Sequence, residues 1–86
     1  MEKIFYVGQC PICREYGRLE ICKDVDSNQY LVICDECLVE WNNPEDALKN
    51  INGHRESIKK GRVLSPALNE IKKIGWDKFI VDSVDF

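Results

Sequence analysis

Two pairs of cysteines are the residues of this chain best suited to chemistry: Cys10-Pro11-Ile12-Cys13 and Cys34-Asp35-Glu36-Cys37. Two residues separate the cysteines of each pair, so a tight backbone turn aims both sulfur atoms at one point. Twenty residues lie between the pairs, which is enough for a two-stranded hairpin that brings the turns together. The spacing predicts one structural Zn²⁺ per chain. Its ligands are expected to be Cys10, Cys13, Cys34 and Cys37.

The sequence fits other possible roles of these cysteines less well. Iron is the main rival metal, because rubredoxins also hold a metal between two such turns. Asp35 and Glu36, between the cysteines of the second turn, favour zinc, although the spacing leaves open whether iron could replace it. Disulfides suit secreted chains, and residues 1–7 contain no long apolar run of the kind found in signal peptides. We therefore expect reduced, metal-bound cysteines in the cytoplasm.

Two further potential ligands are not needed for this site. Cys22 lies within a strand-like pattern, and we expect it to be a small, semi-buried side chain. His54 is the only histidine and follows Gly53 in polar sequence, so we expect it to be exposed to solvent. Four thiolates close the coordination sphere of zinc, and a catalytic zinc needs an open position. The sequence therefore predicts a protein that is not an enzyme.

Hydrophobic patterning predicts the elements that position the cysteines. β-Branched and aromatic residues indicate a strand over 3–7, alternation indicates a second strand around 19–22, and an apolar run indicates a buried strand over 30–33. Residues 24–28 have the composition of a turn. Over residues 3–41 this arrangement resembles the zinc ribbon, in which two metal-binding turns are joined by a hairpin, often with a third strand.

A helix is predicted directly after the ribbon. Asn43 is suited to cap its N-terminus, Pro44 to occupy its first position, and Gly53 to end it. Trp41 is expected to pack this helix against the ribbon. The expected apolar face of the helix consists of Ala47, Leu48 and Ile51.

A second helix start is predicted at Ser65-Pro66, and Gly75 is expected to end that helix. Its expected apolar face consists of Leu68, Ile71 and Ile74. The conformations of residues 53–64 and 76–86 stay open, but the apolar residues of the C-terminal segment are expected to pack on the domain. Without a long apolar run, no membrane span is expected.

The fold class expected from these elements is α+β. It comprises a zinc-ribbon hairpin or three-stranded sheet, two short helices and an apolar C-terminal segment. A chain of 86 residues suits a single domain over 1–86, with a ribbon at 3–41 and a helical part at 43–86 packed on it. A chain this short buries only a marginal core, so the metal should contribute much of its stability.

Charge is unevenly distributed along the chain. The formal net charge is −3, and four thiolates with one dication make it about −5. Residues 35–46 carry acidic side chains and no lysine or arginine. The predicted partner-binding acids are Asp35, Glu36, Glu40, Glu45 and Asp46. A basic segment follows, with Lys59, Lys60, Arg62, Lys72 and Lys73.

The second cysteine turn, Trp41 and the helix start Asn43-Pro44-Glu45-Asp46-Ala47 resemble small bacterial zinc-ribbon proteins. Some of those proteins are immunity proteins that neutralise toxins. The resemblance implies a non-catalytic, acidic inhibitor that binds a basic protein partner such as a nuclease toxin. The alternative is a zinc ribbon that binds nucleic acid through its basic segment, in association with transcription or RNA. The overall acidity makes this alternative the weaker one.

Overall fold

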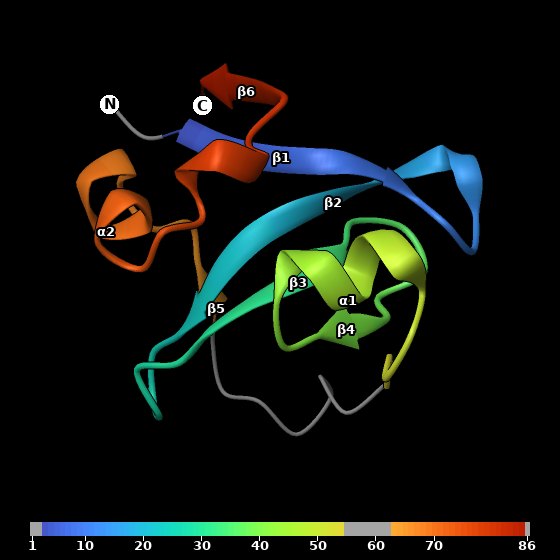
Figure 1. Cartoon of the computed structure of the whole chain (residues 1–86), viewed down its shortest axis with the longest axis horizontal. Helices are drawn as coiled ribbons and strands as arrows, with labels where there is room; N and C mark the ends of the chain where they lie inside the picture. Colours follow the sequence, from blue (N-terminus) through green and yellow to red (C-terminus); the bar gives the residue numbers. More distant parts are fainter. Residues whose placement is uncertain (1–2, 55–62, 86) are drawn as a thin grey trace.

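An antiparallel β-sheet with two short helices beside it makes up residues 3–54 and 63–85, the part of the chain that the computed structural model describes (Figure 1). The strands are β1 (Lys3–Cys10), β2 (Arg14–Asp24), β3 (Tyr30–Cys34), β4 (Glu40–Trp41), β5 (Val63–Leu64) and β6 (Asp82–Asp85). The helices are α1 (Pro44–Lys49) and α2 (Leu68–Lys73), and a 3-10 helix covers Asp77–Phe79. The strand order is β4-β3-β2-β1-β6, with β5 also paired to β2. This combination of sheet and helices is consistent with the predicted α+β class.

The sheet is larger than the predicted hairpin or three-stranded sheet, because β4 pairs with β3 and two segments of undecided conformation also join it. β6 pairs with the first half of β1. β5 pairs with the last two residues of β2, beyond Glu20, where the pairing of β2 with β1 ends. Each added strand satisfies backbone N–H and C=O groups that an edge strand would otherwise leave unpaired.

The two faces of the sheet have different environments. Successive residues of a strand point to opposite faces, so Leu19 and Ile21 of β2 face the main core while Cys22 faces a smaller cluster with Leu31 and Ile33. Cys22 is 3% exposed, so it is more deeply buried than the semi-buried side chain that was predicted. Burial raises the pKa of its thiol. The main core also contains Phe5, Val7, Val32, Trp41, Ala47 and Ile71.

The predicted start of α1 is confirmed in detail. Asn43 precedes the helix in extended conformation, and its side-chain Oδ1 accepts a hydrogen bond from the Asp46 N–H at 2.8 Å. Pro44 occupies the first position. The helix ends at Asn50, which adopts the left-handed conformation with φ 56°. The predicted end at Gly53 is therefore wrong, because an asparagine also tolerates this conformation and comes earlier.

The predicted apolar face of α1 is only partly correct. Ala47 is buried, but Leu48 and Ile51 are each 46% exposed. Ile51 lies beyond the end of the helix, which has only six residues and turns one narrow face toward the sheet. Gly53 has a packing role instead: a Cβ at this position would lie 2.8 Å from Nε1 of the buried Trp41.

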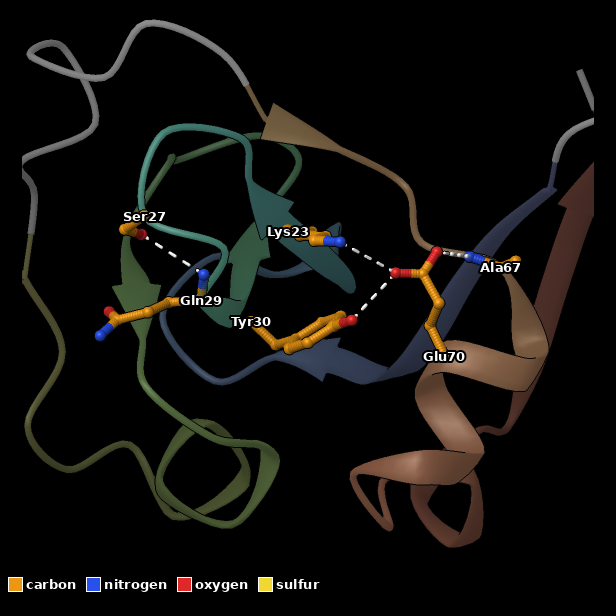
Figure 2. A network of polar contacts seen from close by, with 6 residues as sticks. All are labelled: Lys23, Ser27, Gln29, Tyr30, Ala67 and Glu70. Carbon is orange, nitrogen blue, oxygen red and sulfur yellow. Dashed lines mark hydrogen bonds and ion pairs between the residues drawn. The ribbon is translucent and has the colours of Figure 1, made fainter.

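α2 is anchored to the sheet by the carboxylate of Glu70 (Figure 2). Glu70 Oε1 accepts hydrogen bonds from Lys23 Nζ at 3.1 Å and from the Tyr30 hydroxyl at 2.9 Å, and Oε2 accepts one from the Ala67 N–H at 3.2 Å. Ile71 is buried in the main core. This carboxylate therefore ties the start of α2 to both β2 and β3.

Some residues predicted to be buried in and after α2 lie at the surface. Leu68 is 41% exposed, contrary to the prediction, because Ile71 alone occupies the buried side of this short helix. Gly75, with φ 79°, follows the helix as predicted. Trp76, Phe79 and Ile80 pack on the main core, which confirms the predicted docking for these three residues. Val81 and Val84 are 70% and 38% exposed, so the predicted docking is wrong for them. Across the described ranges, the structure contains no helix of the length and apolarity needed to cross a membrane.

Candidate metal centre

The four predicted ligand cysteines come together at one end of the β1-β2-β3 unit. Cys10 ends β1 and Cys34 ends β3, while Cys13 and Cys37 lie in the turns that follow these strands. The four sulfur atoms all lie within 4.8 Å of one another. Pairing of β2 with both β1 and β3 brings the two turns side by side, as the predicted hairpin requires.

The distances between the sulfur atoms fit a tetrahedral metal site. Cys13 Sγ lies 3.4 Å from Cys34 Sγ, and Cys10 Sγ lies 3.6 Å from Cys37 Sγ. Zinc bound to four sulfurs at about 2.3 Å separates them by about 3.8 Å. Four thiolates are also the donor set that suits zinc or iron and suits magnesium or calcium poorly. The cluster is therefore compatible with one bound transition-metal ion.

Backbone amides point at the sulfurs and prepare them to carry negative charge. The Ile12 N–H donates to Cys10 Sγ at 3.4 Å, and the Glu36 N–H donates to Cys34 Sγ at 3.3 Å. The Cys37 N–H also donates to Cys34 Sγ, at 3.4 Å. Hydrogen bonds to a thiolate favour its charged form. The same tight turns thus orient the ligands and stabilise the form that binds metal.

The thiols have unequal acidities because they share one small space. Burial raises the pKa of the Cys10 thiol, but backbone N–H groups of Cys13 and Ile12 outweigh it and hold this pKa below its ordinary value. Burial and the three neighbouring thiols raise the pKa of Cys13 to about 12. A divalent cation bound between the sulfurs would offset the repulsion among four thiolates.

Gly17 supports the cluster, and sequence reasoning missed it. This residue of β2 is buried against the sulfurs, because a Cβ built there would lie 2.5 Å from Cys34 Sγ and 2.6 Å from Cys13 Sγ. Only a residue without a side chain leaves this space to the ligands. The signal in the sequence was a glycine within an otherwise β-prone segment, which often marks a close approach of another group.

The second cysteine turn is fixed to β2 through Asp35. Its backbone N–H donates to the Arg18 carbonyl at 3.0 Å, and its side-chain Oδ1 accepts from the Arg18 N–H at 2.9 Å. Arg18 also places a cation among the acids, with its guanidinium 4.0 Å from the Tyr6 ring centroid and 3.4 Å from Asp82 Oδ2. The Asp35 carboxylate therefore already has a hydrogen-bond partner within the chain, which leaves it less available to another protein.

The predicted partner-binding acids divide into exposed and buried residues. Asp35, Glu36 and Glu45 are exposed, and Asp46 is half-buried, with Oδ2 accepting from Asn52 Nδ2 at 3.4 Å. Glu40 is 1% exposed, so its predicted place on an accessible acidic face is wrong. Strand alternation turns Trp41 toward the main core and Glu40 toward the opposite face of the sheet.

A backbone bridge between Glu40 and His54 lies beside this buried acid. The Glu40 N–H donates to the His54 carbonyl at 2.7 Å, and the His54 N–H donates back at 3.0 Å. His54 Nδ1 lies 3.9 Å from Glu40 Oε1. His54 was predicted to be exposed to solvent; the residue is half-buried, and its side chain is 40% exposed. Neither Glu40 nor His54 belongs to the cysteine cluster.

The predicted basic segment is described only in part. Lys72 and Lys73 are exposed at the end of α2. The other three basic residues lie outside the described residues: Lys59, Lys60 and Arg62.

Comparisons with known proteins returned no match, whether with family models, curated proteins or solved structures.

Proposed function

We propose that this chain is a non-catalytic zinc protein of the cytoplasm that binds a basic protein partner through the surface around its cysteine turns. The partner class that fits best is a toxin such as a nuclease, which the chain would neutralise as an immunity protein. One observation carries this proposal: the cysteine turns, whose backbone the metal would hold rigid, carry exposed apolar side chains at Ile12 and Leu38 and an exposed acid at Glu36. Rigid binding groups lose little conformational entropy when a partner binds.

Zinc is the ion we propose for the cysteine cluster, in a structural role. Four protein thiolates leave no coordination position for a substrate or a reactive water, so the metal would act only on stability and rigidity. Native mass spectrometry of the purified chain tests this directly, and one zinc ion per chain is the expected result. A red protein with iron–thiolate absorption and no zinc would contradict the assignment.

Apolar side chains beside the ligands would supply contact area for the partner. Ile12 lies between Cys10 and Cys13 and is 45% exposed, and Leu38 follows Cys37 and is 52% exposed. Leu38 adopts φ 64°, a left-handed conformation that costs an ordinary residue about 1–2 kcal/mol. The Leu38 N–H donates to the Cys34 carbonyl at 3.2 Å, so this conformation closes the second cysteine turn and leaves the leucine side chain exposed beside the ligands.

Acidic side chains on the same elements would steer a basic partner. Glu36 lies between two ligands, and Glu45 lies in the first turn of α1. The next turn of α1 carries Leu48, whose Cδ2 would lie 3.2 Å from a Cβ at Gly8, two residues before Cys10. Charges placed around an apolar contact mainly raise the association rate, while the apolar contact limits dissociation.

Kinetics with the identified partner test the proposal. The partner is first captured from the source cell with the zinc-loaded chain, identified by mass spectrometry and purified. The double variant Glu36→Lys/Glu45→Lys should slow association at least about tenfold at low salt, and the difference should shrink as salt rises. Asp35 is left unchanged because its carboxylate holds the Arg18 N–H.

A charge-matched control separates the proposed surface from net charge. The double variant Asp26→Lys/Asp77→Lys changes the total charge equally at exposed positions away from the cysteine turns. It should leave the association rate within about twofold of wild type. Equal slowing by both double variants would overturn the proposed surface, and a purified partner that is acidic would overturn the proposed partner class.

A further inference from the structure

We infer that a hollow at the far end of the β2-β3 hairpin from the cysteine turns binds a nucleobase. The hollow has a volume of about 420 Å³ and lies between three segments that are distant in the sequence. Its lining residues are Gln29, Tyr30, Asn42, Ile74 and Trp76. Tyr30 begins β3 while Cys34 ends it, so this site is separate from the surface proposed for the protein partner.

Two aromatic rings form walls suited to a flat ligand. The rings of Tyr30 and Trp76 have centroids 6.3 Å apart and planes inclined at 72°. A planar ring that stacks on one of them presents its edge to the other, and Ile74 adds an apolar contact. Stacking on aromatic side chains is the usual way in which proteins hold an unstacked base.

Tyr30 is held in position by the network of Figure 2. Its hydroxyl donates to Glu70 Oε1, which also accepts from Lys23 Nζ. The Lys23 ammonium lies 5.5 Å from the centroid of the Tyr30 ring. The ring therefore has a fixed orientation before any ligand arrives, and a pre-organised wall binds a flat ligand at a lower entropic cost.

Two carboxamides supply hydrogen-bonding groups to the same hollow. Gln29 and Asn42 are exposed, and neither side-chain amide has a hydrogen-bond partner among residues 3–54 and 63–85. Figure 2 shows the Gln29 side chain directed away from the Glu70 network. Each amide offers two donor hydrogens beside one acceptor oxygen. Nucleobase edges present the complementary alternation of acceptors and donors, which Asn and Gln can read in pairs.

Charge around the hollow sets the expected direction of the phosphate. A smaller hollow of about 120 Å³ shares three of the lining residues and adds the carboxylates of Asp24 and Glu40. Lys72 and Lys73 directly precede Ile74, which lines the hollow, and both are exposed. A nucleotide should therefore bind with its base between the amides and its phosphate toward the end of α2. A free mononucleotide and a base of a single strand share this chemistry.

Nuclear magnetic resonance of the zinc-loaded, ¹⁵N-labelled chain tests the inference with AMP, GMP, CMP and UMP as probes. At least one of them should cause saturable shifts in the side-chain amides of Gln29 and Asn42 and in the Trp76 indole N–H. The double variant Gln29→Ala/Asn42→Ala should bind that probe at least about fivefold more weakly. The control Asn69→Ala removes an exposed amide of α2 and should bind as wild type does.

Further measurements distinguish a free nucleotide from a nucleic-acid strand, and a nucleobase from a sugar. A tighter and more salt-dependent interaction with an eight-nucleotide single-stranded RNA would identify a strand as the source, and equal affinity would identify the free nucleotide. Shifts with glucose or maltose and none with nucleotides would overturn the inference, because sugars also stack on aromatic rings. Absence of shifts with all probes at several millimolar, or unchanged affinity of the double alanine variant, would overturn it as well.

Discussion

Gly17 gives the most direct test of the packing at the metal centre. A Cβ at this position would lie 2.5 Å from Cys34 Sγ, whereas ordinary van der Waals contacts of a Cβ begin at 3.4 Å. Alanine therefore requires a displacement of about 0.9 Å, the difference between these distances, in a closely packed region. The same Cβ would lie 2.6 Å from Cys13 Sγ, so β2 cannot relieve the clash with Cys34 by moving toward Cys13.

A displacement of this size is large for a metal site. Ligand distances in such sites hold to within about 0.2 Å, so Gly17→Ala would open the tetrahedron or strain β2. Changes next to metal ligands cost roughly 10–100-fold in affinity, and a direct clash with two ligands belongs at the upper end. We expect Gly17→Ala to bind zinc about 100-fold more weakly, measured by competition with a chromophoric chelator.

Gly75→Ala is the matched control for this measurement. Gly75 adopts φ 79°, and a Cβ at this position would have no neighbouring atom within 4 Å among the described residues. Alanine there should therefore cost about 1 kcal/mol of stability through backbone strain alone. Its zinc affinity should equal that of the wild type. Wild-type affinity in Gly17→Ala would refute the reasoning, because β2 could then not lie against the sulfurs.

Three further predictions concern stability. Excess chelator should remove the far-UV circular dichroism signals of the sheet and the helices together. Each helix has only six residues and is marginally stable alone. A helical signal that persists after complete zinc loss would contradict this prediction. The Lys23 ammonium, the Tyr30 hydroxyl and the Ala67 N–H hold the pKa of the Glu70 carboxyl below its ordinary value of 4.5. The stabilisation is therefore complete above that value and is lost as pH falls through the lower folded-state pKa. Glu70→Gln should therefore lower the urea midpoint of the zinc-loaded chain at pH 7, where the wild-type carboxylate is ionised, and an unchanged midpoint would count against the network. Leu38→Asn should raise the free energy of unfolding, measured by urea titration, by about 0.5–1 kcal/mol, because asparagine tolerates the left-handed conformation. A decrease would show that the leucine side chain contributes to folding.

Several features follow from neighbouring residues alone, and the sequence predicted them. The cysteine turns need only two residues between ligands, which is why the ligand set Cys10, Cys13, Cys34 and Cys37 could be proposed from spacing. The start of α1 depends on Asn43, Pro44 and an N–H three residues after the cap. Because these local conformations depend on residues close together in the sequence, the packing of distant segments changes them little.

Other features depend on which distant segments meet, and only the tertiary structure decided them. β6 pairs with β1, from opposite ends of the described chain, and a pattern of apolar residues does not name its partner strand. Glu40 is buried because the sheet and the bridge to His54 enclose it, although its sequence neighbourhood is that of a surface acid. Gly17 meets two sulfurs through strand pairing, and the rings of Tyr30 and Trp76 meet because Glu70 draws α2 onto the sheet. Burial and close approach are properties of packed segments, so residue type and spacing alone could not predict them.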